Sequence, residues 1–536
     1  MKKYLFPVIL IILGLILASS LFNPGWFASH DGVFHILRAD EAVKMLKSGQ
    51  FPLRWAGNFD EGYGIPLFNF IYPLPYYLST ALILSGMSSV LAVKLILLVS
   101  YLIGGLGIYQ LFARENKMLA FFSAALYLAT PYQFLNIFVR GALGEVVAMG
   151  IIPWVLVSFH DLSHQKALRW YHSLPLALLL IAHNFLGLLF MAFLIAYLFF
   201  AKLFSKRALL SFALSLGLAA FFLLPMIVER TMLYSFHNQD FTFRFDQHFV
   251  YLKQFLYGKW DYWYSLPGPG DGVSFQLGLA QIIVVALTTI FVALKKRTRK
   301  NIFLVFAFFF TVFMMSSRSF YIWDSLTLLQ TVQFPWRFLF LTTLLAPLIA
   351  FVFLSSFKSK KLQIILITIF LGLALFNVRN YRRPIQFLNE EEFGSLYTLY
   401  LTKTATTFRT EILPMWSPQD VRYKSDDVLV SSGNIILEGV VATPTNITFT
   451  ANNKEEIGEL TILRNYFPSW HVQVEGDNSD DLLSPRDDGT ISLMLNPGTH
   501  DYRVYVGSSN IESIANIISL GSIISVLYVL TRDRKK

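Results

Sequence analysis

Long apolar runs recur along most of this chain, and short clusters of Lys and Arg separate them. Each run has about 20 residues, which is enough for an α-helix to cross the hydrocarbon core of a bilayer. The runs are continuously apolar and do not alternate, which excludes a membrane β-barrel. Only 15% of the residues are charged, compared with about 25% in soluble domains. The sequence therefore predicts a polytopic α-helical membrane protein.

The net charge of +10 has a topological explanation. Its Lys and Arg residues fall in the short connections between apolar runs, as the positive-inside rule describes for cytoplasmic loops. The charge therefore gives no indication of a nucleic-acid partner. The chain contains no cysteine, so disulfide bonds and thiolate chemistry are also excluded.

The basic clusters set the predicted topology. Lys2 and Lys3 place the start of a first helix, residues 4–22, in the cytoplasm; cleavage as a signal peptide near Ser20 is the alternative. Residues 67–84, broken by two prolines, are expected to lie at the outer face without crossing, because a crossing there would invert every later cluster. About twelve transmembrane helices result, with both termini cytoplasmic and the long connections outside.

Three parts follow one another along the chain. Residues 1–377 form the multispanning domain, residues 378–510 an extracytoplasmic domain, and residues 511–536 a last transmembrane helix with a basic cytoplasmic tail. From about residue 425 the second part carries β-branched and aromatic runs with frequent turn signals, which predicts an antiparallel β-sandwich of roughly 80 residues. The outer loops of the multispanning domain are residues 23–66, 229–276 and 317–337.

The first outer loop carries the strongest candidate for chemistry. Asp31 opens a predicted amphipathic helix that runs to Lys47, with Ser29 as the expected N-cap. Asp31, His35 and Arg38 recur at helical spacing and share its polar side, so the helix is expected to lie along the membrane surface. A carboxylate in the first turn is stabilised as the anion by the helix dipole, which suits a general base. The alternatives are a helix cap for Asp31 and a solvated face for the other two residues.

Two arginines at predicted outer helix ends, Arg140 and Arg337, are candidates for binding a phosphate. An arginine can contact a phosphate with two donors. Snorkelling to lipid headgroups is the alternative for both side chains. Further substrate-binding or supporting candidates are His35, Arg38, Asp60, Glu61, Glu145 and His183. Loop polarity is the alternative for Asp60 and Glu61, and a turn position is the alternative for His183.

The sequence predicts no metal site. His160 and His164 have the spacing of two ligands on one helix, but no third ligand lies close in the sequence and both are expected in the cytoplasm. A divalent metal at the outer loop is left as an alternative that the sequence does not support.

A series of short motifs runs through the chain: Asp31-Gly32-x-x-His35, Gly62-Tyr63-Gly64, Tyr72-x-x-Pro75-Tyr76, Arg140-Gly141-Ala142-x-x-Glu145 and Phe334-Pro335-Trp336-Arg337. Together they resemble a prokaryotic family of membrane proteins labelled 6-pyruvoyl-tetrahydropterin synthase-related. The pterin chemistry of that label is not expected, because such a synthase needs a zinc site of three histidines and this chain has no His-x-His.

That family is in turn similar to the GT-C glycosyltransferases, multispanning enzymes that use polyprenyl-phosphate sugars. The resemblance implies a GT-C-like fold with an acidic catalytic residue in the first outer loop, where Asp31 stands. Many GT-C enzymes carry an adjacent acidic pair there. This chain has His30-Asp31 instead, which leaves metal dependence open.

The expected function is therefore transfer of a sugar from a polyprenyl-phosphate donor to a glycan, lipid or protein acceptor at the outer face of the cell membrane, with inversion. Asp31 would be the general base, and Arg337 and Arg140 would neutralise the departing lipid phosphate. The alternative is a non-catalytic membrane protein that binds or translocates a glycolipid or cell-envelope polymer.

Overall fold

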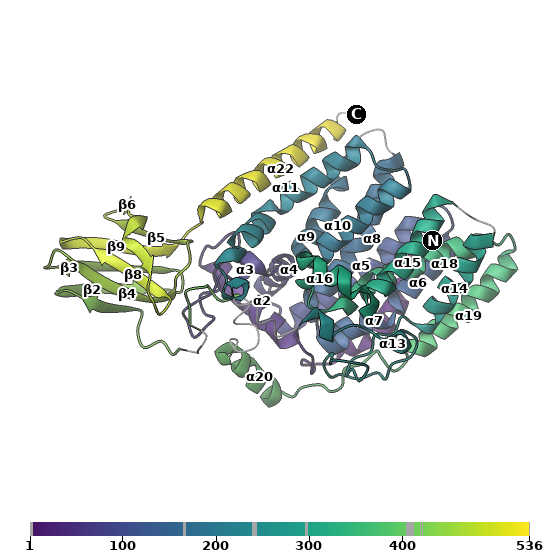
Figure 1. The fold of residues 1–536 in the computed structure, drawn as a ribbon, viewed down its shortest axis with the longest axis horizontal. Coiled ribbons are helices and arrows are strands. Elements are labelled where there is room, and N and C mark those ends of the chain that lie inside the picture. Colours follow the sequence, from purple (N-terminus) through teal and green to yellow (C-terminus); the bar gives the residue numbers. More distant parts are fainter. Residues whose placement is uncertain are drawn as a thin grey trace.

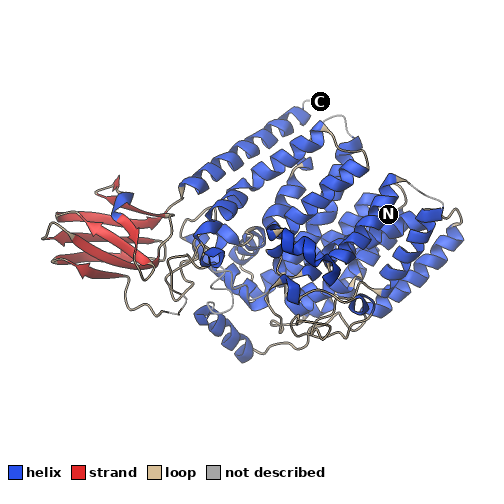
Figure 2. Cartoon of the chain, in the orientation of Figure 1, coloured by secondary structure: helices blue, strands red, loops and turns tan. Residues whose placement is uncertain are grey.

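The computed structural model describes residues 4–164, 168–237, 244–294, 298–403, 412–418, 420 and 422–534. A large helical body carries a β-domain at one end, and α22 (Asn510–Arg534) leads back from that domain along the body (Figures 1 and 2). The predicted topology markers Lys2 and Lys3 lie outside the described residues.

The helices of the body vary widely in length. In its first half they are α1 (Leu5–Leu17), α2 (Gly32–Lys47), α3 (Leu67–Phe70), α4 (Leu74–Leu84), α5 (Ser89–Phe112), α6 (Lys117–Leu128), α7 (Pro131–Phe134), α8 (Leu143–His164), α9 (Leu174–Ala182) and α10 (Asn184–Phe200). In its second half they are α11 (Lys206–Val228), α12 (Tyr234–His237), α13 (Leu252–Leu256), α14 (Leu279–Leu294), α15 (Arg299–Met314), α16 (Phe320–Ser325), α17 (Thr327–Gln330), α18 (Leu339–Leu354), α19 (Lys360–Val378) and α20 (Glu390–Lys403).

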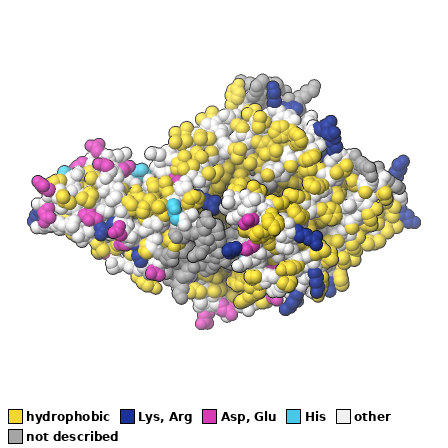
Figure 3. Space-filling model, viewed as in Figure 1, with side chains coloured by type: hydrophobic (Ala, Val, Ile, Leu, Met, Phe, Trp, Pro, Cys, Tyr) yellow, Lys and Arg dark blue, Asp and Glu magenta, His cyan; other side chains and the backbone are white. Residues whose placement is uncertain are grey.

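Several of these helices have the length and apolar character of membrane spans. Among the described residues six qualify, or up to eight if each of two bent helix pairs counts as one span. Hydrophobic side chains cover most of the visible surface of the helical body, and many of its Lys and Arg residues lie at the edges (Figure 3). This surface fits a lipid environment, and the total of about twelve spans stays a prediction.

Polar residues at the predicted boundaries start many of the long helices. Their side chains accept hydrogen bonds from backbone N–H groups of the first turn, which otherwise lack partners. The capping residues are Ser88 for α5, Asn116 for α6, Ser205 for α11, Thr298 for α15 and Ser359 for α19.

The predicted helix of the first outer loop exists as α2, but its setting differs from the expectation. Ser29 does not cap it; Asp31 occupies the N-cap position, without a side-chain cap hydrogen bond. The stretch from Gly32 to Leu37 is buried, because α4, α5 and α20 pack against this helix. The polar side of α2 is therefore covered by protein and is not a solvated face, and its position along the membrane surface stays a prediction.

Two further segments bear on the site. After α6 the chain continues through α7 into a π-helix, Leu135–Arg140, and only Gly141 and Ala142 separate this π-helix from α8. Residues 67–84 form the short helices α3 and α4, and the 11 residues of α4 are too few to cross a bilayer, which takes about 20.

The C-terminal part confirms the predicted antiparallel β-domain. Its strands are β1 (Val428–Ser432), β2 (Ile435–Ala442), β3 (Asn446–Asn453), β4 (Gly458–Asn465), β5 (Trp470–Val474), β6 (Asp477–Asn478), β7 (Leu483–Pro485), β8 (Thr490–Leu495) and β9 (Gly498–Val506). One sheet has the order β1-β4-β8-β7 and the other β2-β3-β9-β5-β6. Apolar residues from both sheets form one core, which Trp55 of the first loop joins.

Candidate functional site

Asp31 is fixed where the start of α2 meets the end of the π-helix. The backbone N–H of Asp31 donates to the carbonyl of Arg140 at 2.8 Å, and that of His30 donates to the carbonyl of Val139 at 3.1 Å. These bonds join two segments more than 100 residues apart in the sequence, so the position of Asp31 depends on tertiary structure and not on α2 alone.

Two glycines allow this close approach. Gly141 adopts a φ of +64°, a left-handed conformation that favours glycine. A Cβ atom on Gly32 would lie 2.4 Å from the Ser29 hydroxyl and from the ring of Trp26. The glycines that follow Asp31 and Arg140 therefore both allow the two backbone segments to approach each other closely beside these candidate site residues.

The Asp31 side chain is half-buried and lies in a positively charged setting. It interacts electrostatically with the guanidinium groups of Arg38 and Arg140. Because its carboxylate makes no cap bond to α2, the simple helix-cap interpretation does not account for it.

His35 and Arg38 meet at one tyrosine on α4. The Nδ1 atom of His35 lies 2.7 Å from the Tyr76 hydroxyl, and Arg38 also hydrogen-bonds to Tyr76. A guanidinium only donates, so the hydroxyl oxygen accepts from Arg38 and its O–H can donate to a neutral His35. His35 is 3% exposed, and burial holds its pKa well below the usual range.

Glu145, near the start of α8, connects two arginines. One of its carboxylate oxygens lies 2.8 Å from Arg140 and accepts a bond of 2.9 Å from the Tyr132 hydroxyl. The other oxygen lies 3.4 Å from Nε of Arg337 and 4.0 Å from Nε2 of His183. Glu145 is 2% exposed, so this is a buried ionic network.

Aromatic rings surround the same group. The Arg140 guanidinium lies 4.9 Å from the centre of the Trp336 ring, and the His183 ring stacks on Tyr72 with centres 4.8 Å apart. Such rings exclude water and stabilise the cations by cation–π attraction.

The structure thus brings together seven of the nine predicted site residues, which we call the Asp31 cluster: Asp31, His35, Arg38, Arg140, Glu145, His183 and Arg337. Three arginines face two carboxylates in this group, so with neutral histidines it carries a surplus of one positive charge. A buried cationic surplus is costly unless an anion joins it.

Asp60 and Glu61 occupy a different place. Asp60 is 5% exposed and accepts a hydrogen bond of 2.8 Å from the Asn465 amide of β4. The Asn465 amide also donates to the Gly64 carbonyl at 2.7 Å. The Gly-rich turn after Glu61 is therefore a contact between the first loop and the β-domain, and for Asp60 this contact replaces loop polarity as the explanation.

Two other segments lie beside the start of α2. The His30 ring stacks on Tyr264 with centres 4.7 Å apart, and Phe34 stacks on Tyr400 of α20 at 4.2 Å. The aromatic loop of residues 257–276 and α20 are thus placed next to Asp31.

Sequence reasoning missed several residues of the site. Tyr76 and Tyr132 supply hydroxyls, Tyr72 and Trp336 supply ring faces, and Gly32 and Gly141 supply space. A signal was present for all of these except Tyr132, because the other five residues belong to the short motifs that carry the family resemblance.

The described residues contain no group of three or more His, Cys, Asp or Glu side chains arranged to hold a metal ion. In α8 the Nδ1 atom of His164 lies 2.8 Å from the backbone carbonyl of His160, an interaction within one helix.

Comparison with protein-family models gives a match. The family model described as 6-pyruvoyl-tetrahydropterin synthase related domain, membrane protein, matches residues 68–385. This stretch includes Arg140, Glu145, His183 and Arg337, and Asp31 precedes it. A search of curated proteins finds none that matches.

Proposed function

The chain belongs to the 6-pyruvoyl-tetrahydropterin synthase-related family of membrane proteins, and we propose that it is a GT-C-like glycosyltransferase with Asp31 as its general base. The proposal places the site at the outer membrane face of a body with about twelve spans. The donor is a polyprenyl-phosphate sugar, and the acceptor is a glycan, lipid or protein hydroxyl.

One observation carries the proposal: a half-buried carboxylate lies beside three arginines with a surplus positive charge, of which Arg140 is buried and Arg38 and Arg337 are half-buried. Glycosyl transfer from a lipid phosphate needs both features. A base must accept the acceptor's proton, and fixed cations must stabilise the phosphate that leaves.

The proposed reaction is a single displacement. The acceptor oxygen attacks the anomeric carbon while Asp31 takes the proton of its hydroxyl. The bond between the anomeric carbon and the phosphate oxygen breaks on the opposite side, which inverts the configuration and releases polyprenyl phosphate. The anionic product is stabilised by Arg140 and Arg337, and Arg38 is added to this set because its Nε has no hydrogen-bond partner among the described residues.

Glu145 acts indirectly in this scheme. Its contacts of 2.8 Å to Arg140 and 3.4 Å to Arg337 hold both guanidinium groups in place. A preorganised pair of cations costs no reorganisation when the phosphate departs. His30 and Tyr264, stacked beside Asp31, offer ring faces for a sugar or acceptor.

The test compares Asp31→Asn with Asp40→Asn in the purified full-length protein. Asp40 lies on the same helix but bonds Ser89 and Tyr397, so it controls for loss of a carboxylate from α2. With a panel of polyprenyl-phosphate hexoses and membrane extract as acceptor source, Asp31→Asn should lose at least 100-fold in release of polyprenyl phosphate, at the low end of a general base contribution of about 10²–10⁴. Binding of polyprenyl phosphate, followed by Trp fluorescence, should persist.

Full turnover by Asp31→Asn would refute the assignment of the base. The competing function, non-catalytic binding or translocation of a glycolipid, uses the same cationic group. It predicts that wild-type protein and Asp31→Asn bind polyprenyl phosphate alike and that neither releases it from the donor.

A further inference from the structure

A second site lies at the far end of the helical body from Asp31. It is a cavity of about 210 Å³ lined by residues of α5, α8, α10, α15 and α18. On α8, Glu145 belongs to the Asp31 cluster and His160 lines the cavity, about 22 Å away at a helical rise of 1.5 Å per residue. On α10, His183 caps the near end and Leu198 lines the cavity at the other.

Most of the wall of this cavity is apolar. Its walls include Phe112 and Phe351, whose rings stack with centres 3.9 Å apart, together with Phe159 and Leu194. An apolar cavity of about 150 Å³ already holds a benzene molecule. This space therefore has room for a segment of a lipid acyl chain.

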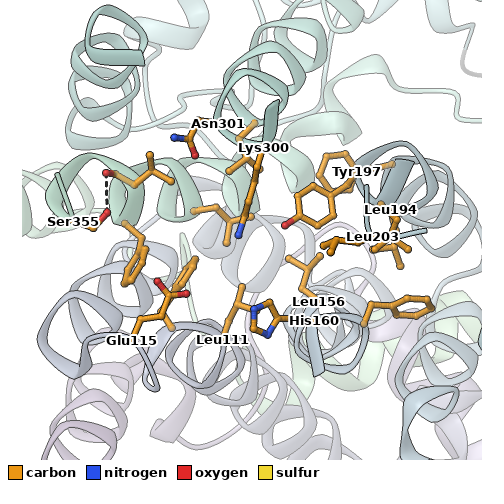
Figure 4. A pocket seen from close by; sticks show the side chains of 18 residues that line it. Leu111, Glu115, Leu156, His160, Leu194, Tyr197, Leu203, Lys300, Asn301 and Ser355 are labelled. Carbon is orange, nitrogen blue, oxygen red and sulfur yellow. Dashed lines mark hydrogen bonds between the residues drawn. The ribbon is translucent and has the colours of Figure 1, made fainter. Parts of the chain in front are cut away.

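The cavity's polar residues carry two opposite charges. Lys300 at the start of α15 and Glu115 after α5 both line it, and no ion pair joins them in the described part of the chain. The Lys300 side chain extends into the cavity toward the Tyr197 hydroxyl and the His160 ring, and Glu115 approaches from the side of Ser355 (Figure 4). Both charged residues are exposed, so their charged groups are accessible to a lipid headgroup, as those of snorkelling side chains are.

We propose that this cavity binds a zwitterionic membrane lipid with a primary ammonium group, that is, a phosphatidylethanolamine. The phosphate is bound by Lys300 with the Tyr197 hydroxyl, and the ammonium is bound by Glu115. One acyl chain enters the apolar interior. A headgroup with both charges complements Lys300 and Glu115, which form no ion pair with each other among the described residues, whereas a purely anionic headgroup would meet the Glu115 carboxylate.

A primary ammonium is also favoured over a quaternary one. Its N–H groups can donate hydrogen bonds to the Glu115 carboxylate, which a choline headgroup cannot do. The site would discriminate between these two headgroups because only the primary ammonium makes a close contact with the carboxylate. This inference stands independently of the proposed glycosyl transfer.

Native mass spectrometry of the full-length protein, titrated with phosphatidylethanolamine, phosphatidylglycerol or phosphatidylcholine of identical chains, tests it. Wild-type protein should bind one phosphatidylethanolamine about fivefold more tightly than either other lipid. Lys300→Gln should weaken that binding about fivefold. Arg299→Gln, one residue away but not lining the cavity, should leave it unchanged.

Glu115→Gln gives the sharpest result. It should weaken phosphatidylethanolamine binding and strengthen phosphatidylglycerol binding, so that the preference reverses. The proposal is overturned if wild-type protein binds phosphatidylglycerol or phosphatidylcholine as tightly as phosphatidylethanolamine, or if Lys300→Gln and Arg299→Gln behave alike.

Discussion

Gly141 packs against Gly32 so closely that a Cβ atom on Gly141 would lie 3.0 Å from the Cα and N atoms of Gly32. This contact brings the π-helix end to the start of α2 and so sets the distance between Arg140 and Asp31. A glycine pair, and not a charged residue, is thus the local cause of the site's geometry.

Gly141→Ala should disturb both the fold and the site. The alanine would need a left-handed backbone, which costs roughly 1–2 kcal/mol, and its Cβ would press on the Gly32 backbone, with overpacking costing about 1–3 kcal/mol more. Gly49→Ala is the control, because Gly49 has a φ of +87° but open space around its Cβ position. Thermal unfolding in detergent should show a larger loss for Gly141→Ala; equal losses would mean that the contact with Gly32 is unimportant.

Glu145→Gln should destabilise the body strongly. The change leaves Arg140 and Arg337 without their carboxylate in a buried setting, and breaking a buried pair costs about 3–5 kcal/mol. Arg114→Gln is the matched control, since Arg114 pairs with Asp161 at 3.5 Å while 76% of its side chain is exposed. That change should cost no more than about 1 kcal/mol.

The same two variants separate structure from proposed chemistry. If Glu145→Gln folds well enough to purify, its binding of polyprenyl phosphate should weaken, because the two guanidinium groups lose their fixed positions. An unfolding midpoint equal to that of Arg114→Gln would contradict the ionic network.

The regular elements were largely predictable, and the setting of α2 was not. Apolar runs and the residues that cap them indicate where α5, α11, α18 and α19 begin and end, since a membrane-type helix depends on local hydrophobicity. Burial of α2 depends on α4, α5 and α20, which approach it from distant parts of the chain. Periodicity describes one helix and carries no information about what covers its polar side.

The candidate site was likewise predictable from the sequence only in part. Charged residues at helix ends, such as Arg140 and Arg337, stand out against an apolar background, and the structure places them together around Glu145. Their chemical roles stay predictions. The role of the Tyr132 hydroxyl could not be predicted, because a tyrosine in a membrane helix is usually an interfacial residue. Tyr76 belongs to a family motif, but the motif does not indicate what its hydroxyl contacts. Only the contacts to His35 and Glu145 distinguish them.

Low pH should reduce stability partly through His35. Burial holds the folded-state pKa of His35 well below the usual value of about 6.5. The unfolded chain therefore takes up a proton first as the pH falls, so the stability is complete above about pH 6.5 and declines below it, by at most about 1.4 kcal/mol per pH unit for one proton.

Unfolding midpoints at pH 7.5 and 5.5 test whether stability falls as the pH is lowered. His35→Gln should show a smaller difference between the two than wild-type protein, because the variant lacks the buried imidazole. His237→Gln, which alters an exposed histidine, should keep the wild-type difference. A His35→Gln variant that is equally sensitive to acid would exclude this origin.

The predicted orientation of the helical body in the membrane can be measured by labelling introduced cysteines. The chain contains no cysteine of its own, so no background labelling arises. Single cysteines at Gly49, after α2, and at Lys358, between α18 and α19, stand at the two predicted faces. An impermeant maleimide added to intact cells should label Gly49→Cys and should label Lys358→Cys only after permeabilisation. The reverse pattern would place the Asp31 cluster at the cytoplasmic face and would rule out an acceptor outside the cell. Labelling of a third variant, Ser85→Cys at the end of α4, decides whether α4 crosses: the positive-inside argument expects it to react with the same side as Gly49→Cys.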